Sequence, residues 1–291
     1  MASMRSIKRR RESVQSTQQI TKAMKLVSTV KLQRAKARAE QSKAYFHGMY
    51  ATVKGILARA GSINHPYLEP GKGSKKAVLI ITSNRGLAGG YNSNVIKLLT
   101  RSEEYTKDNC LVYSVGKKGK DALQKAGYEI VKDYSDVIDE PIYVDAMQIV
   151  KDLLKDFEEG KISEILLAYT GFKNTVSHEP TVLPLLPIDL SESGVEEDEN
   201  GNPEDKLLMN FEMNEIEAIS MLIPKYMTSI VYGAMIEAVA SENGARMQAM
   251  DSATSNAEDM ISALSLQYNR ARQSSITQEL TEIIAGAEAI S

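Results

Sequence analysis

The distribution of proline along the chain restricts which folds it can form. All eight prolines lie between Pro66 and Pro224, so the first 65 and the last 67 residues contain none. A proline inside a helix removes a hydrogen bond and clashes with the preceding turn, so only the proline-free ends can form very long helices. We therefore expect three parts: an N-terminal helix in 1–60, a central domain in 75–213 and a C-terminal helix in 214–291.

Both ends are rich in residues that favour helix, above all Ala, Lys, Arg, Gln and Glu in the segment from Met4 to about Ala60. At about 1.5 Å per residue that helix would be roughly 85 Å long, and a helix from Asn214 to Ile290 roughly 110 Å. Such helices are unstable without a packing surface. They must therefore pack against each other or against partner proteins.

The C-terminal helix carries a repeat that predicts how it packs. Residues spaced alternately by three and four run from Ile219 to Ser275, which is the heptad pattern of a left-handed coiled coil. Small residues alternate there with Met and Ile, which lets a second helix approach closely. On pattern alone, a self-associating structural coiled coil remains an alternative.

The expected partner is the N-terminal helix, which has only a sparse apolar stripe: Ile7, Val14, Ile20, Met24, Val27 and Val30. After Ser275 the C-terminal pattern slips by one residue, and that helix is also about 20 residues longer than its partner. Its last turns are therefore expected to extend beyond the coiled coil.

Charge is strongly polarised along the chain. Residues 1–43 contain twelve Lys or Arg and two Glu, so they carry +10 while the rest of the chain carries −13. A solvated face and a nucleic-acid surface are both readings of such a basic segment. Nucleic acid is disfavoured because Met4 to Ala44 contains no aromatic residue on which a base could stack.

The middle of the chain is expected to be α/β. Short apolar runs at 77–82, 110–116 and 164–170 indicate buried strands, and helix-like segments lie near 93–107, 117–126 and 143–158. This alternation predicts a mostly parallel, Rossmann-like sheet. The segment 191–205 has seven acids and no basic residue, which is typical of a solvated loop.

The sequence offers only weak candidates for chemistry. GKKGKD (116–121) and SNRGLAGGYN (83–92) contain glycines but match neither the P-loop nor the dinucleotide-binding spacing. Cys110 is the one cysteine and lies in an apolar run, and the three histidines are scattered. We therefore expect no catalytic, cofactor-binding or metal-binding residues, with a nucleotide-binding enzyme as the rival interpretation.

No continuous apolar stretch approaches the about 20 residues that a membrane-spanning helix needs. The basic N-terminus has no apolar segment behind it, so it is not expected to be a secretory signal. A single cysteine excludes an internal disulfide. A chain in a reducing cytoplasm is expected.

Particular segments resemble the gamma subunits of the rotary (F-type) ATP synthases of bacterial type. The similarity covers the whole chain, and its most specific motifs are QITKAMKLV in the first helix and the ITQELTEIIAGAEA ending of the last. The segments are 5–35, 83–92, 245–257 and 268–289. The glycine loop departs from the family pattern at Asn84 and Ala88.

This resemblance implies a non-catalytic rotor. The two end helices would form an antiparallel shaft inside a ring of alpha and beta subunits. The central domain would be the foot, bound to the epsilon subunit and the membrane c-ring at the cytoplasmic face of the cell membrane, one copy per complex. Rotation of the shaft would couple transmembrane ion flow to ATP synthesis or hydrolysis.

The resemblance also implies which residues contact the ring. Basic side chains there would face acidic loops of the beta subunits, and an apolar tip would turn in a sleeve formed by the ring. The implied contact residues are Lys22, Met24, Lys25, Arg246, Arg272, Gln273, Thr277 and Glu279, and the tip residues are Ile276, Leu280 and Ile283.

Overall fold

The structure is a computed structural model that describes residues 4–59, 65–174, 177–188 and 215–290. The chain forms two compact units. The first, which we call the two-helix unit, contains Met1–Thr29 and Arg246–Ser291, and the second, the sheet unit, contains Val30–Ala245. The acidic segment 191–205 lies outside the described residues.

The sheet unit is built on a five-stranded sheet in the order β3-β2-β1-β4-β5. The first four strands run parallel, and β5 pairs antiparallel with β4. Three of these strands confirm the apolar runs seen in the sequence. The strands are β1 (Lys75–Ile81), β2 (Cys110–Val115), β3 (Glu129–Asp133), β4 (Ile162–Phe172) and β5 (His178–Leu186).

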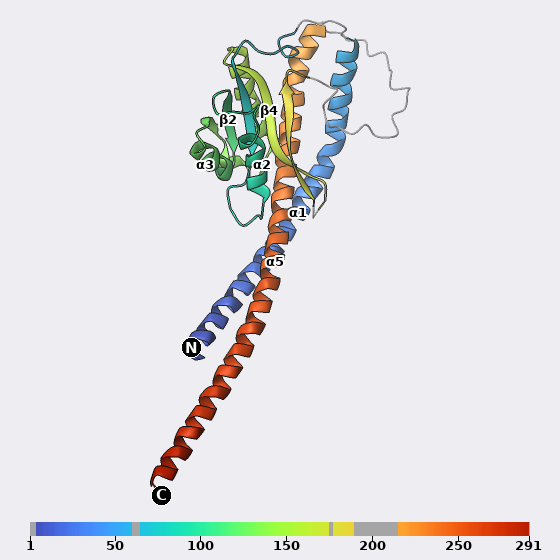
Figure 1. The fold of residues 1–291 in the computed structure, drawn as a ribbon. Coiled ribbons are helices and arrows are strands. Elements are labelled where there is room, and N and C mark those ends of the chain that lie inside the picture. The colour runs from blue at the N-terminus through green and yellow to red at the C-terminus, as the bar shows by residue number, and fades with distance from the viewer. Residues whose placement is uncertain (1–3, 60–64, 175–176, 189–214, 291) are drawn as a thin grey trace. The chain divides into compact units, whose positions relative to one another are not determined.

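Helices cover both faces of the sheet, as expected for a parallel α/β fold (Figure 1). One face packs against α2 (Tyr91–Thr100) and α3 (Lys117–Lys125). The other packs against α4 (Tyr143–Glu158) and the first part of α5 (Glu215–Ile290). A short 3₁₀ turn, η1 (Ser135–Val137), connects β3 to α4. The middle of each central strand is therefore mostly apolar, because both of its faces are buried.

Three details differ from the sequence prediction, and the first is β5, which none of the predicted apolar runs covered. The helix expected near 93–107 ends at Thr100, and the following residues form a loop. β3 was missed because it is an edge strand whose residues are mostly exposed, so it lacks the apolar run of its neighbours.

The long end helices are confirmed: α1 (Met4–Arg59) has 56 residues and α5 has 76. Helix α5 continues through Pro224, where the Thr228 hydroxyl donates to the Pro224 carbonyl at 2.7 Å. By length and composition alone, the segment Ile216–Ala287 could cross a membrane, but 56% of its most apolar window is buried inside the fold. That burial is the behaviour of a core helix.

Within the two-helix unit, α1 and α5 run antiparallel. Contacts between them pair ascending positions on α1 with descending positions on α5, beginning with the Arg11 guanidinium, which lies 5.4 Å from the centre of the Tyr268 ring. Thr21 meets Thr254, and Lys25 meets Asp251. The antiparallel coiled coil expected from the heptad pattern is therefore present in this unit.

Candidate functional site

The two-helix unit contains all the residues for which the sequence predicted contact with a partner. Its α5 segment follows the heptad prediction closely. Met250, Ala257 and Leu264 are buried, and the seam positions between them are half-buried. Beyond Ser275 every residue whose exposure is described, through Ala287, is exposed. The seam therefore ends where the sequence pattern slips.

The stripe predicted on α1 is wrong in its second half. Ile7 is buried and Val14 is half-buried, as expected, but Ile20, Val27 and Val30 are 57%, 58% and 48% exposed. The residues that face α5 include small polar ones, Thr21 and Ser28, which are 8% and 2% exposed. The α1 seam is a regular heptad too: Met4, Ile7, Arg11, Val14, Gln18, Thr21, Lys25 and Ser28 are its buried or half-buried positions.

Small polar residues of α1 can face α5 because their hydroxyl groups can be buried there at little cost in free energy. The hydroxyl oxygens of Thr21 and Thr254 lie 2.8 Å apart. Each is also within hydrogen-bond distance of a carbonyl of its own helix, at Gln18 and Met250 respectively. A buried hydroxyl with hydrogen-bond partners carries no large desolvation penalty. Short side chains also let the helices approach closely, so the larger aliphatic residues are left on the outside.

Two further polar contacts flank the threonine pair. The Gln18 side-chain amide donates to Glu258 at 3.0 Å, and the Lys25 ammonium pairs with Asp251 at 2.6 Å. Both carboxylates are exposed, so each contact is worth only a fraction of a kcal/mol to about 1 kcal/mol. The sequence could have revealed this seam if small polar residues had been counted on α1 as they were on α5.

The structure assigns different environments to the predicted contact residues. Lys22 is exposed and Met24 is half-buried, whereas Lys25 is occupied by its pair with Asp251. Arg246 is half-buried and makes contacts of its own. The remaining four lie along α5 and are all exposed: Arg272, Gln273, Thr277 and Glu279.

The apolar tip of α5 is fully available for contact. Ile276, Leu280 and Ile283 are 49%, 54% and 67% exposed, and the neighbouring Ile284 is 59% exposed. On α1, Ile20, Leu26 and Val27 form a second exposed apolar surface, which we call the α1 outer stripe. The sequence reasoning missed this surface because it assigned two of its residues to the seam. Exposed apolar side chains gathered on one unit are typical of a binding surface.

The rival interpretation of a nucleotide-binding enzyme rested on the two glycine segments, 83–92 and 116–121. Both are used for packing. At the start of α3 the N–H groups of Lys117, Lys118 and Gly119 donate to Asn84 Oδ1, the Ser83 carbonyl and Thr82 Oγ1. These are the groups that would otherwise bind a phosphate. In the glycine loop, the Ser83 N–H donates to Asn92 Oδ1 at 2.9 Å. The segment 83–92 is therefore the turn from β1 to α2, and 116–121 is the start of α3 after β2, bonded to the residues that follow β1.

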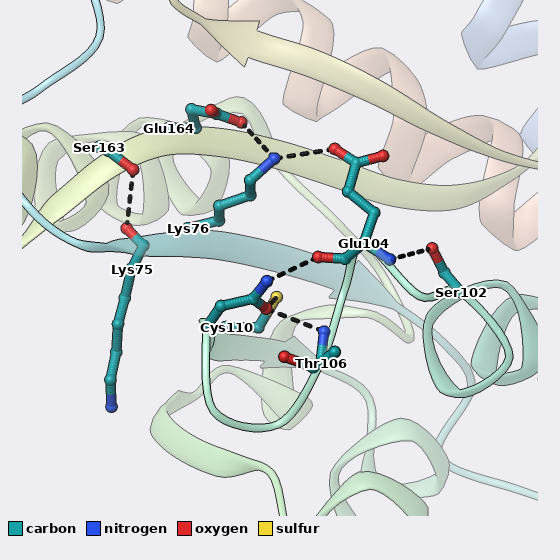
Figure 2. Close-up of polar contacts among 9 residues, drawn as sticks. Lys75, Lys76, Ser102, Glu104, Thr106, Cys110, Ser163 and Glu164 are labelled. Atoms are coloured by element: carbon teal, nitrogen blue, oxygen red, sulfur yellow. Dashed lines mark hydrogen bonds and ion pairs between the residues drawn. The ribbon is translucent and has the colours of Figure 1, made fainter.

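A charged cluster lies at the other end of the parallel strands, around the start of β1 (Figure 2). The Lys76 ammonium lies 2.8 Å from a Glu104 oxygen and 3.0 Å from a Glu164 oxygen. Burial alone would lower the pKa of Lys76, but the hydrogen bonds to the two carboxylates outweigh it and raise that pKa. The lysine thus stays charged and fastens the loop before β2 to β4.

Cys110 lies beside this cluster and is fully buried. Burial raises the pKa of its thiol to about 11, so the thiolate needed for nucleophilic attack is scarce at neutral pH. This supports the expectation of a core cysteine. In the part of the chain that the structure describes, no group of three or more His, Cys, Asp or Glu side chains could hold a metal ion.

Comparisons with known proteins point to one family. The family model described as ATP synthase matches residues 3–290. A gamma chain of ATP synthase from Lachnoclostridium phytofermentans is 62% identical over the whole of both chains. The gamma chain from Alkaliphilus metalliredigens is 42% identical over 99% of this chain and 98% of its own. A gamma chain from Acetobacterium woodii described as sodium ion specific is 38% identical, with the same coverage.

Solved structures share the fold. The rotor of the Euglena gracilis mitochondrial ATP synthase matches with a TM-score of 0.66 at 20% identity, over 94% of this chain and 98% of that one. The central stalk and c-ring structure of the Tetrahymena thermophila mitochondrial ATP synthase contains a chain that matches with a TM-score of 0.58 at 21% identity, over 80% and 99%. From its full-length identity to these relatives, the chain belongs to the family of ATP synthase gamma chains.

Proposed function

We propose that this chain is the central rotor shaft of an ATP synthase and couples ion flow across a membrane to ATP synthesis, or ATP hydrolysis to ion pumping. One structural observation supports this role in addition to the family membership. The two-helix unit turns apolar side chains outward on both α1 and the tip of α5. A self-contained structural coiled coil would bury them, so these surfaces favour a protein sleeve around the helices.

The partners follow from this role. Alternating alpha and beta subunits would surround the two helices, and the sheet unit would serve as the foot, bound to the epsilon subunit and the c-ring. In this assignment 1–60 and 214–291 are the helices of the shaft and 75–213 is the foot. The complex would lie at the cytoplasmic face of the cell membrane, with one copy of this chain and no catalytic group contributed by it.

Coupling in such a rotor requires that each orientation of the shaft favours a different conformation at each catalytic site. Exposed Lys22 and Arg272 offer positive charge to acidic loops, while Gln273, Thr277 and Glu279 offer hydrogen-bonding groups farther along α5. Arg246, Met24 and Lys25 are less exposed, so we assign them contacts that also depend on their neighbours in the coiled coil. Ile276, Leu280 and Ile283 would bear on the apolar sleeve.

The direct test is reconstitution. The chain is expected to co-purify with the alpha and beta subunits as a single copy and to raise their ATPase activity. A self-associating scaffold would instead form ordered homodimers and leave that activity unchanged. Nucleotide titration of the isolated chain addresses the enzyme alternative, which predicts saturable binding that the rotor does not.

Substituting Met24 with lysine (Met24→Lys) is expected to weaken coupling without preventing assembly. The new charge would lie on a half-buried position of α1 and contact the ring in only some orientations. We expect ion pumping per ATP hydrolysed to fall at least about fivefold, within the usual range of coupling free energies. The measurement is ATP-driven ion uptake and ATP hydrolysis in the same inverted membrane vesicles.

The matched control is Met147→Lys, which makes the same change at an exposed methionine of α4 in the sheet unit. It should leave the ratio of pumping to hydrolysis unchanged. Equal ratios in Met24→Lys and wild-type vesicles would contradict the assignment of Met24 to the rotor surface.

A further inference from the structure

The last described pair of the β4–β5 ladder is Phe172 and His178, which we call the hairpin end, and it contacts α5 through the histidine. The His178 ring lies against the backbone at Gly244, where an added Cβ would come within 2.8 Å of His178 Cε1. The ring also lies near Phe172, with the ring centres 5.9 Å apart. The glycine thus makes room for the imidazole, and the contact joins the hairpin to the helix.

Among the described residues, no group around this imidazole accepts a hydrogen bond from a ring N–H. Both ring nitrogens are buried, and among the described residues neither has a hydrogen-bond partner. Two nearby elements carry hydroxyls that are also buried and have no hydrogen-bond partner in the described part of the chain, those of Thr170 on β4 and Ser241 on α5. A second proton on the ring would create a buried cation with two unsatisfied N–H groups, which is costly.

The charged groups around the hairpin end do not remove this cost. From α1, the Lys36 ammonium lies 4.9 Å from the centre of the Phe172 ring, so its charge opposes a further positive charge. The Lys173–Glu179 pair of the hairpin is closed at 2.7 Å and exposed. From α5, Glu242 has interactions of its own. A further group is Glu237, also on α5.

Burial also acts on the ionisation of Glu237. Burial raises the pKa of its carboxyl, and a hydrogen bond from the Phe172 N–H offsets this only in part. The same carboxyl, together with burial, raises the pKa of the Tyr169 hydroxyl. Burial thus opposes ionisation of Glu237 as it opposes protonation of His178.

We propose that His178 is a proton-controlled latch, in which the neutral ring holds the end of the β4–β5 hairpin on α5 and protonation releases it. The assignment rests on the contact with Gly244, the enclosed nitrogens and the positive charge from α1. It is independent of the partners proposed for the chain.

The direction of the pH dependence follows from the lowered pKa. Burial lowers the pKa of His178 below its ordinary 6.5, so the released hairpin binds a proton more readily than the latched one. The contact is at full strength above about pH 6.5 and weakens as the pH falls toward the lowered pKa. Glu237 acts in the opposite sense, because its raised pKa makes the contact stronger as the pH falls.

Hydrogen exchange of the full-length chain tests the proposal. Amide protection would be followed in peptides covering 170–182 and 236–245 between about pH 8 and about pH 5, corrected for the intrinsic pH dependence of exchange. We expect a loss of protection on acidification, because the released hairpin binds the proton more readily than the latched one. Constant or rising protection in wild-type protein would overturn the proposal, and no variant is needed for that outcome.

Two variants identify the responsible group. His178→Phe keeps an aromatic ring beside Phe172 but cannot be protonated, so it should remove the acid-induced loss of protection. The control is His65→Gln, at a buried histidine whose pKa is also lowered by burial. It should leave the pH response of the hairpin intact. A full pH response in His178→Phe, or its loss in His65→Gln, would assign the effect to another group and refute the latch.

Discussion

Replacing two residues of the α1 outer stripe with glutamate (Ile20→Glu/Val27→Glu) should prevent stable binding to the alpha and beta subunits while leaving the two-helix unit folded. Both side chains are more than half exposed in the chain itself, so the carboxylates stay hydrated there. In a surrounding sleeve they would have to be desolvated, at a cost of several kcal/mol for each uncompensated charge. We expect affinity to fall by more than about a hundredfold, which corresponds to about 3 kcal/mol.

The measurement combines co-purification with the alpha and beta subunits and circular dichroism of the isolated chain. The control is Val131→Glu/Met147→Glu, which adds the same charge at two exposed apolar residues of the sheet unit. It should bind the two catalytic subunits as the wild type does. If the stripe variant also binds with wild-type affinity, the outward-facing residues of α1 are not part of the rotor surface.

Replacing Gly116 with alanine is expected to unfold much of the sheet unit. Gly116 precedes α3 at φ +108°, where an added Cβ would come within 2.1 Å of the Thr82 carbonyl oxygen. Because the clash is with backbone, no side-chain rotation relieves it. The strain and the overpacking together should cost at least about 3 kcal/mol. The loss should appear as faster hydrogen exchange in β1 and β2 and as a lower soluble yield.

Gly86→Ala is the matched control, because an added Cβ at that position meets nothing within 4 Å and its φ is not positive. Its exchange pattern should match that of the wild type. Wild-type protection of β1 and β2 in Gly116→Ala would show that the junction between β1 and α3 can rearrange, contrary to the packing described for this turn.

The sequence predicted those elements whose local pattern is strong. Apolar runs located β1, β2 and β4 because both faces of a parallel sheet are buried, and the heptad repeat located the seam of α5. The edge strand β3 and the early end of α2 were not predicted, since exposed strands and loops have no comparable signal. The candidate contact residues were named through family resemblance, and their contacts with other subunits remain predictions.

The sequence by itself determined that long helices precede and follow an α/β domain along the chain, with Pro224 near the start of the second, and that the last turns of α5 extend beyond the seam. Only the tertiary structure decided which face of α1 meets α5. The apolar residues of α1 are too sparse to decide it: Ile7 and Val14 lie on the seam, and Ile20 and Val27 lie off it. The face was set by close approach and hydrogen bonding, because Thr21 can be buried against Thr254 with its hydroxyl paired. The aliphatic side chains were left outside, and they form the surface on which the proposed function depends.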